Sequence, residues 1–253
     1  MCHDDDSRPP APSNPGPVHE HGPITVLSAD GTQVMAYRAL PEAAAPAGVV
    51  ILPDVRGLHP YYEQLTIRFA EAGFAAIAID HFGRTLGIGS RLGVPDYQAL
   101  IAQVRPQDVE ADVRAAAAEL TAAGARPIFT VGFCFGGSQS WRLAASDLDL
   151  AGCIGFYGRP PLIADVEDQL AKPILMLVAG ADRATPLTDF QALSDRMAQR
   201  GQVHEMYVYE GAPHSFFDRA FGEWADACAD AWERILAFTA RFGRAVEVPA
   251  VKE

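Results

Sequence analysis

Apolar residues follow two alternating patterns along most of this chain. Short runs rich in Val, Ile and Ala are typical of buried strands, whereas longer segments with apolar side chains three and four residues apart are typical of amphipathic helices. The predicted strands are residues 47–52, 75–80, 127–131, 151–157, 173–179 and 203–209, and the predicted helices are residues 61–72, 107–123, 138–145, 187–199 and 223–242. Short apolar strands that alternate with helices predict an α/β fold, with a mostly parallel central sheet and helices on both faces.

The N-terminal part departs from this alternation. Asp30 and Gly31 separate two strand-like segments, residues 24–28 and 33–40, and this pair of residues predicts an N-terminal β-hairpin. Residues 1–22 contain five prolines and no apolar periodicity. We therefore expect them to form an extended or partly disordered arm.

The size and composition fit one globular domain. The chain has 253 residues, of which 49% are apolar, enough to form a sizeable core. Because α/β folds of about 250 residues are routinely single domains, we expect one domain over residues 23–245 and a C-terminal tail over residues 246–253.

The net charge of the chain limits the classes of partner that it can bind. The formal net charge is −12, and a surface this negative repels nucleic acid and anionic lipid, so a small-molecule partner is expected. The chain has no uninterrupted apolar stretch of membrane-spanning length. Its N-terminus is acidic where a secretory signal would be basic and then apolar, so the cytoplasm is the expected location.

Residues 132–137, Gly-Phe-Cys-Phe-Gly-Gly, carry the sharpest chemical signal. They lie between a predicted strand and a predicted helix, which is the place of a nucleophile elbow with Cys134 in the nucleophile position. The positive end of the helix dipole favours a thiolate there. The N–H of Phe135 is placed to bind an oxyanion.

Two further residues complete a candidate triad. Asp182 follows the predicted strand at residues 173–179, and His214 follows the one at residues 203–209. The order nucleophile, acid, base is the order that α/β-hydrolases use. An imidazole can accept the thiol proton, and a carboxylate can fix its tautomer, so we expect a Cys-His-Asp triad at the carboxyl ends of the strands.

The remaining cysteines and acidic residues predict no metal or cofactor. The four cysteines, Cys2, Cys134, Cys153 and Cys228, have no spacing typical of a zinc site or a disulfide framework. Residues 2–6 contain metal-ligand types, but a terminus lacks the fixed geometry of a metal site. No phosphate-binding loop or dinucleotide fingerprint is present.

The motifs at residues 132–137, residues 52–58 (Leu-Pro-Asp-Val-Arg-Gly-Leu) and residues 213–216 (Pro-His-Ser-Phe) together resemble the dienelactone hydrolase family. The likeness extends over residues 24–242. It implies an α/β-hydrolase fold and a cofactor-free hydrolase that opens a lactone or cleaves a small ester through an acyl-enzyme, as carboxymethylenebutenolidase does.

The resemblance also assigns roles to residues of the first loop. It implies that Asp54 matches a carboxylate, glutamate in the founding members, that pairs with the resting thiol until substrate releases Cys134 to His214. It implies as well that the N–H of Val55 is a second oxyanion donor.

Substrate binding is expected from four side chains. The resemblance matches Arg84 to an arginine that binds a substrate carboxylate, so the substrate could be anionic. Arg219 is the nearest candidate for a second such arginine, although Asp218 occupies the matching place. We also expect Ser215, beside the candidate base, and His81, on an early strand–helix loop, to line the pocket.

Two other readings stay open. One is a related thioesterase, or an esterase of other substrate range. The other is a non-catalytic ligand-binding protein on the same scaffold, or a redox sensor that responds to oxidation of Cys134. A monomer or a small homo-oligomer is expected in each case.

Overall fold

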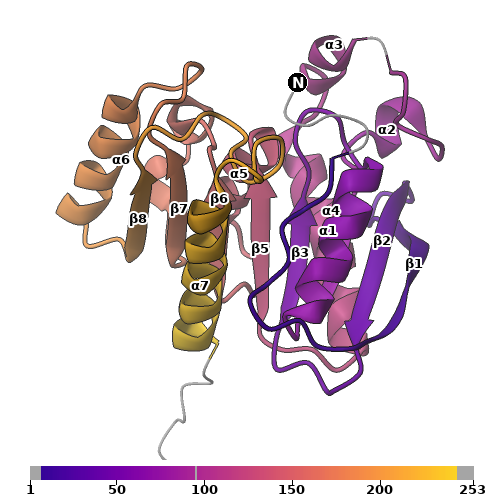
Figure 1. Cartoon of the computed structure of the whole chain (residues 1–253). Coiled ribbons are helices and arrows are strands. Elements are labelled where there is room, and N and C mark those ends of the chain that lie inside the picture. Colours follow the sequence, from indigo (N-terminus) through magenta and orange to yellow (C-terminus); the bar gives the residue numbers. More distant parts are fainter. Residues whose placement is uncertain (1–6, 95, 244–253) are drawn as a thin grey trace, which may run out of the picture.

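The computed structural model describes residues 7–94 and 96–243, and one eight-stranded sheet lies at its centre (Figure 1). The strands are β1 (Val18–Leu27), β2 (Gln33–Pro41), β3 (Gly48–Leu52), β4 (Ala75–Ile79), β5 (Ile128–Phe133), β6 (Gly152–Phe156), β7 (Ile174–Ala179) and β8 (His204–Tyr209). Their order across the sheet is β1-β2-β4-β3-β5-β6-β7-β8. β2 pairs antiparallel with β1 and β4, and all other pairs are parallel. The hairpin and the mostly parallel sheet are thus confirmed.

Helices cover both faces of the sheet. The longer helices are α1 (Pro60–Glu71), α4 (Pro106–Ala122), α5 (Phe135–Arg142), α6 (Leu187–Gln199) and α7 (Ala225–Phe242). The short ones are α2 (Gly83–Leu86) and α3 (Tyr97–Ile101), with the 3₁₀ turns η1 (Leu143–Ala145), η2 (Pro160–Ile163) and η3 (Glu167–Gln169). Figure 1 shows α1 and α7 in front of the sheet and α4 behind it. Among the described residues, no helix has the length and apolar character that crossing a membrane requires.

Strand β3 shows why both faces must be covered. Val49 and Ile51 pack into a core cluster with α1 and α7, whereas Val50 and Leu52 pack into a second cluster with α4, α5 and α6. Because successive side chains of a strand point to opposite faces, a strand that is apolar at every position needs a helical layer on each side.

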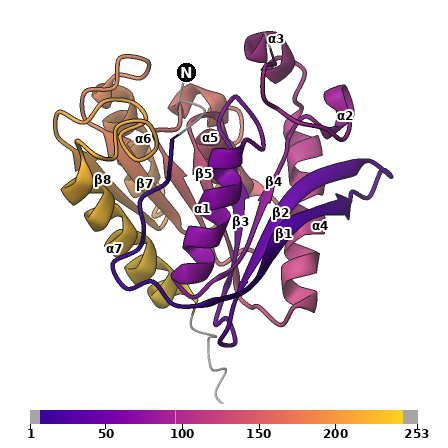
Figure 2. The ribbon, with the colours of Figure 1, turned by 45° about the vertical axis from the view of Figure 1, so that its right-hand side comes forward.

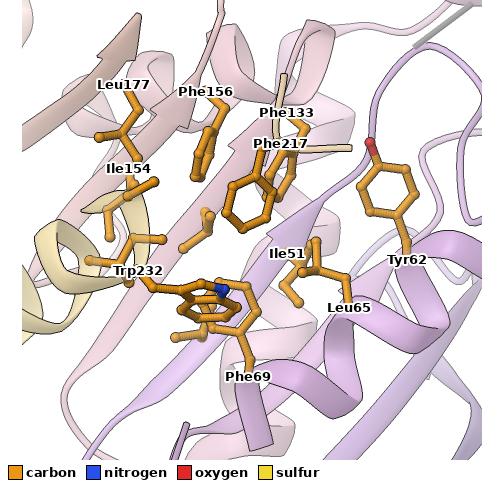
Figure 3. Close-up of a cluster of buried hydrophobic side chains, with 14 of the residues drawn as sticks. Ile51, Tyr62, Leu65, Phe69, Phe133, Ile154, Phe156, Leu177, Phe217 and Trp232 are labelled. Carbon is orange, nitrogen blue, oxygen red and sulfur yellow. The ribbon is translucent and has the colours of Figure 1, made fainter. Parts of the chain in front are cut away.

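The core beneath the carboxyl ends of the central strands is aromatic (Figure 3). The ring of Phe133 stacks on Phe156 with centroids 4.7 Å apart, and Phe217 lies 4.6 Å from Phe156. Phe217 follows His214 by a few residues, so the loop after β8 is anchored in this cluster. A fixed loop is what a precisely placed side chain requires.

The proline-rich arm packs against the body where the structure describes it. Residues 7–17 run along the front of the molecule between α1 and α7 (Figures 1 and 2). The indole N–H of Trp232 donates to the carbonyl of Pro10 at 3.3 Å, and Gly16 N–H donates to Glu71 O at 2.7 Å. β1 begins at Val18, so the end of the predicted arm is already strand. Residues 1–6 and the predicted tail at 246–253 lie outside the described residues.

Candidate active site

The strand–helix turn at the end of β5 has the geometry of a nucleophile elbow. Cys134 joins β5 to α5 with φ 55° and ψ −114°, a backbone conformation that is strained for a residue with a side chain. Its N–H donates to Phe156 O at 3.0 Å, and its carbonyl accepts from Ser138 N at 3.2 Å. These bonds hold the strained turn. Strain of this kind is kept at functional sites.

Two glycines make the turn possible. A Cβ on Gly132 would lie 1.9 Å from the carbonyl oxygen of Gly136, and a Cβ on Gly136 would lie 2.1 Å from Leu52 O. No side chain fits at either place. The sequence placed the helix start at residue 138, because glycine is a poor helix former. In the structure the helix begins at Phe135 and includes Gly136 and Gly137. Gly136 is present because the helix start approaches the neighbouring backbone too closely for a side chain.

Asp182 and His214 are in direct contact. Asp182 Oδ2 lies 2.7 Å from His214 Nδ1, and the carboxylate side chain is 0% exposed while the imidazole is 23% exposed. The other carboxylate oxygen accepts the N–H of Ala184 at 2.7 Å. The pair therefore fixes the tautomer with the proton on Nδ1, which leaves Nε2 as the basic nitrogen.

The loop after β3 packs against the start of α5. The Cβ that Gly136 lacks would clash with the carbonyls of Leu52 and Pro53, so this loop and the elbow are in close contact. Asp54 is fully buried, and its Oδ1 accepts the N–H of Arg56 at 2.8 Å. Its own N–H donates to the hydroxyl of Tyr62 at 3.0 Å.

A buried ion pair that sequence reasoning missed organises the neighbouring loops. The Asp80 carboxylate accepts from Arg91 Nη2 at 2.8 Å and from Arg91 Nε at 3.1 Å. It also accepts the N–H groups of Leu58 at 3.0 Å and Phe82 at 2.9 Å. One carboxylate thus ties together the loop after β3, the loop after β4 and the segment beyond α2. An aspartate directly after an apolar strand was the available signal.

A second buried acid lies near the candidate base. Asp218 is fully buried, its Oδ2 accepts the hydroxyl of Tyr157 at 2.9 Å, and its Oδ1 accepts the N–H of Arg219 at 2.6 Å. Burial, together with the charge of Asp54, raises the pKa of Asp218 to about 7. The ring of Tyr157 also lies 4.9 Å from the imidazole of His214. Tyr157 thus connects the buried carboxyl group of Asp218 with the ring of His214.

Arg84 is held by carboxylates of its own chain. Its Nη1 lies 2.7 Å from Asp112 Oδ2 and its Nε lies 3.0 Å from Asp30 Oδ2. Nη2 donates to Ser28 Oγ at 3.1 Å. These contacts join α2 to the hairpin turn and to α4. They give the guanidinium a structural role, and substrate binding by Arg84 stays a prediction.

The three other predicted substrate contacts lie on the same edge of the sheet. Arg219 is exposed just beyond Asp218. Ser215 has φ 66° and is 2% exposed, and its hydroxyl has no hydrogen-bond partner within the described part of the chain. His81 follows β4, and its ring lies 5.3 Å from that of Phe135, the residue after Cys134. The loop after β4 thus touches the elbow through His81.

The cysteines differ in accessibility. Cys134 is partly exposed, whereas Cys153 and Cys228 are buried, and burial raises the pKa of each of these two thiols to about 12. No group of three or more His, Cys, Asp or Glu side chains with the geometry to hold a metal occurs in residues 7–94 and 96–243. Residues 2–6 lie outside this range.

Comparison with known proteins identifies the family. The model of the dienelactone hydrolase family matches residues 34–243. This chain belongs to the dienelactone hydrolase family. A Salmonella typhi protein named "Putative carboxymethylenebutenolidase" is 27% identical over 92% of this chain and 95% of its own length. A Bradyrhizobium protein named "Probable 2-oxo-3-(5-oxofuran-2-ylidene)propanoate lactonase" is 29% identical over 84% of this chain and 91% of its own length. The chain is a hydrolase that acts on esters or lactones.

Solved structures show the fold. A Klebsiella pneumoniae protein described as a "Putative Dienelactone Hydrolase" superimposes with a TM-score of 0.76 at 24% identity, over 88% of this chain and 98% of its own. A dienelactone hydrolase-like promiscuous phosphotriesterase from metagenomic libraries has a TM-score of 0.71 at 22% identity, over 88% of this chain and 99% of its own. The expected α/β-hydrolase fold is confirmed.

Proposed function

We propose that this dienelactone hydrolase-family protein opens a lactone or cleaves a small ester through a Cys-His-Asp triad and an acyl-enzyme. The strained elbow that presents Cys134 carries the proposal. His214, with its proton held on Nδ1 by Asp182, accepts the thiol proton through Nε2. The sulfur attacks the carbonyl carbon, and the imidazole then protonates the leaving oxygen. Water, activated by the same imidazole, hydrolyses the thioester.

An oxyanion hole between β3 and β5 supports this chemistry. Phe135 is the first residue of α5, so its N–H has no acceptor within the helix. Val55 lies in the loop that the start of α5 touches through Gly136. We propose that these two N–H groups stabilise the negative oxygen of the tetrahedral intermediate.

The acyl-enzyme is the first experimental test. p-Nitrophenyl acetate should give a burst of nitrophenol close to one equivalent, with the acetyl group found on the peptide that contains Cys134. Steady-state assays should include dienelactones, simple lactones and p-nitrophenyl esters. Acetyl found only on another residue would disprove the assignment of the nucleophile. Absence of hydrolysis with all of these substrates would favour a non-catalytic binding protein.

The redox-sensor reading has less support. A sensor that forms an intramolecular disulfide needs a second accessible thiol. Within residues 7–94 and 96–243 the two other cysteines, Cys153 and Cys228, are buried and the pKa of each is raised to about 12, so both thiols are poor partners for an oxidised Cys134.

Asp54 is proposed to keep the resting thiol protonated. A buried carboxylate near the sulfur opposes a second negative charge, until substrate engages or displaces it. Asp54→Asn should therefore raise the fraction of thiolate near neutral pH, speed inactivation by peroxide and lower turnover. The ultraviolet absorbance of the thiolate is recorded against pH without substrate. An unchanged titration with reduced turnover would leave Asp54 a positioning residue.

A further inference from the structure

His81 is a buried imidazole with an unpaired ring nitrogen. It is 8% exposed, and its Nε2 is fully enclosed and has no hydrogen-bond partner in the described part of the structure. The ring stands edge-on between Phe82, with centroids 4.4 Å apart, and Phe135, with centroids 5.3 Å apart. Phe135 directly follows Cys134, so the unsatisfied imidazole lies beside the nucleophile elbow.

An unsatisfied buried polar group destabilises a fold, so it calls for an explanation. Other half-buried histidines of this chain have partners: His204 bonds to Ser194 Oγ at 2.8 Å and to Gln202 O at 2.9 Å. Phenylalanine would keep the ring contacts of His81 without burying an unpaired nitrogen. A ligand that supplies the missing partner accounts for the histidine.

The imidazole is neutral. Burial lowers the pKa of His81 to about 4, the charge of Arg91 lowers it as well, and the charge of Asp80 opposes both. A neutral imidazole offers one N–H donor and one nitrogen acceptor. It can therefore bind an uncharged oxygen without bringing a counter-charge into the site.

Two arginines of the segment that follows β4 are already paired with carboxylates. Arg84 is paired with Asp30 and Asp112, and Arg91 is paired with Asp80. A substrate carboxylate that approached these groups would compete with carboxylates already in place, two of which, Asp80 and Asp112, are at most 2% exposed in their side chains. The surroundings of His81 thus favour an uncharged polar group.

We propose that His81 selects substrates whose acyl part carries an uncharged oxygen acceptor, such as a keto group, by donating an imidazole N–H to it. This inference rests on the proposed ester or lactone hydrolysis at Cys134. His81 then acts on specificity, and its hydrogen bond forms with the substrate while the thiol attacks the scissile carbonyl.

The test compares three p-nitrophenyl esters that differ at one group: valerate, levulinate with a keto group, and the half ester of succinate with a carboxylate. The parent enzyme should have a higher kcat/KM for levulinate than for the other two. His81→Phe should lower the levulinate-to-valerate ratio about 3- to 10-fold, the range for one neutral hydrogen bond. His81→Gln and His81→Asn place an amide N–H near Nε2 and near Nδ1, and the variant that keeps the ratio identifies the donating nitrogen.

A structural histidine would give different results. On the proposal, His81→Phe should raise the Tm, because it removes an unsatisfied buried group. If His81 is structural, the variant should have a lower Tm and equal losses of activity on all three esters, and this result would overturn the inference. So would a preference of the parent for the succinate ester, or a levulinate-to-valerate ratio that His81→Phe leaves unchanged. His204→Phe, at a histidine with two partners, is the matched control and should keep the ratio. A parent enzyme inactive on all three esters would overturn the proposed function as well.

Discussion

Replacing Cys134 by alanine is expected to reduce kcat/KM by at least about 10⁴-fold, to the level that binding and the oxyanion hole alone support. The substitution removes the sulfur, and the backbone of the elbow is held by glycine contacts and main-chain bonds that alanine keeps. Cys134→Ser should restore only weak activity, because an alkoxide forms much less readily than a thiolate. The activity of both variants is measured as initial rates with the best substrate from the steady-state assays.

Buried cysteines provide the control. Cys153 lies on β6, fully buried, and Cys153→Ala should retain most of the turnover, with a lower Tm from the lost packing. Iodoacetamide should modify Cys134 before Cys153 or Cys228, because those two thiols are enclosed and their pKa values are raised. Label found first on either buried thiol, or near-parental turnover of Cys134→Ala, would show that the nucleophile lies elsewhere.

The placement of the candidate triad could be predicted because each residue follows an apolar strand closely. Such strands can be predicted from short runs of apolar residues, and in a parallel sheet their carboxyl ends share one edge. The sequence thus indicates that Cys134, Asp182 and His214 lie on that edge. The length of the bond between Asp182 and His214 depends on the loop conformations, which the pattern does not encode.

Pairings between distant polar residues could not be predicted. Tyr157 and Asp218 are far apart in sequence, and their hydrogen bond depends on both being enclosed by the aromatic core around Phe217. Arg91 reaches Asp80 from an irregular segment with no periodicity. In each case a charged or polar residue that would be ordinary at the surface is buried by tertiary packing, and local sequence carries little information on that.

The sequence also could not decide whether the proline-rich arm packs against the body of the protein. Proline suppresses regular structure whether a segment packs or not, so the sequence left an extended arm and a partly disordered arm equally open. Pro9, Pro10 and Pro12 are buried in the structure, and the carbonyl of Pro10 accepts from Trp232 on α7. The partner of this segment is a helix near the other end of the chain.

Asp182→Asn is expected to lower kcat/KM at pH 7 by about 10²- to 10⁴-fold. The amide can keep the bond from Ala184 N–H with its oxygen, which turns its NH₂ group toward His214 Nδ1. Nδ1 must then accept a hydrogen bond, so the proton moves to Nε2, and the imidazole loses the lone pair that would take the thiol proton. The loss should shrink as pH approaches that of free thiol ionisation, about 8.5, because a thiolate formed in solution needs no base.

The pH dependence separates this explanation from misfolding. A variant that fails to fold would lose activity equally at every pH, whereas a tautomer effect should leave the Tm within a few degrees of the parent and give partial recovery at alkaline pH. Asp195→Asn, at an exposed aspartate on α6, is the matched control and should be neutral at every pH. A profile for Asp182→Asn that runs parallel to the parent from pH 6 to about 9, the span over which a cysteine thiol ionises, would mean that Asp182 does not set the state of His214.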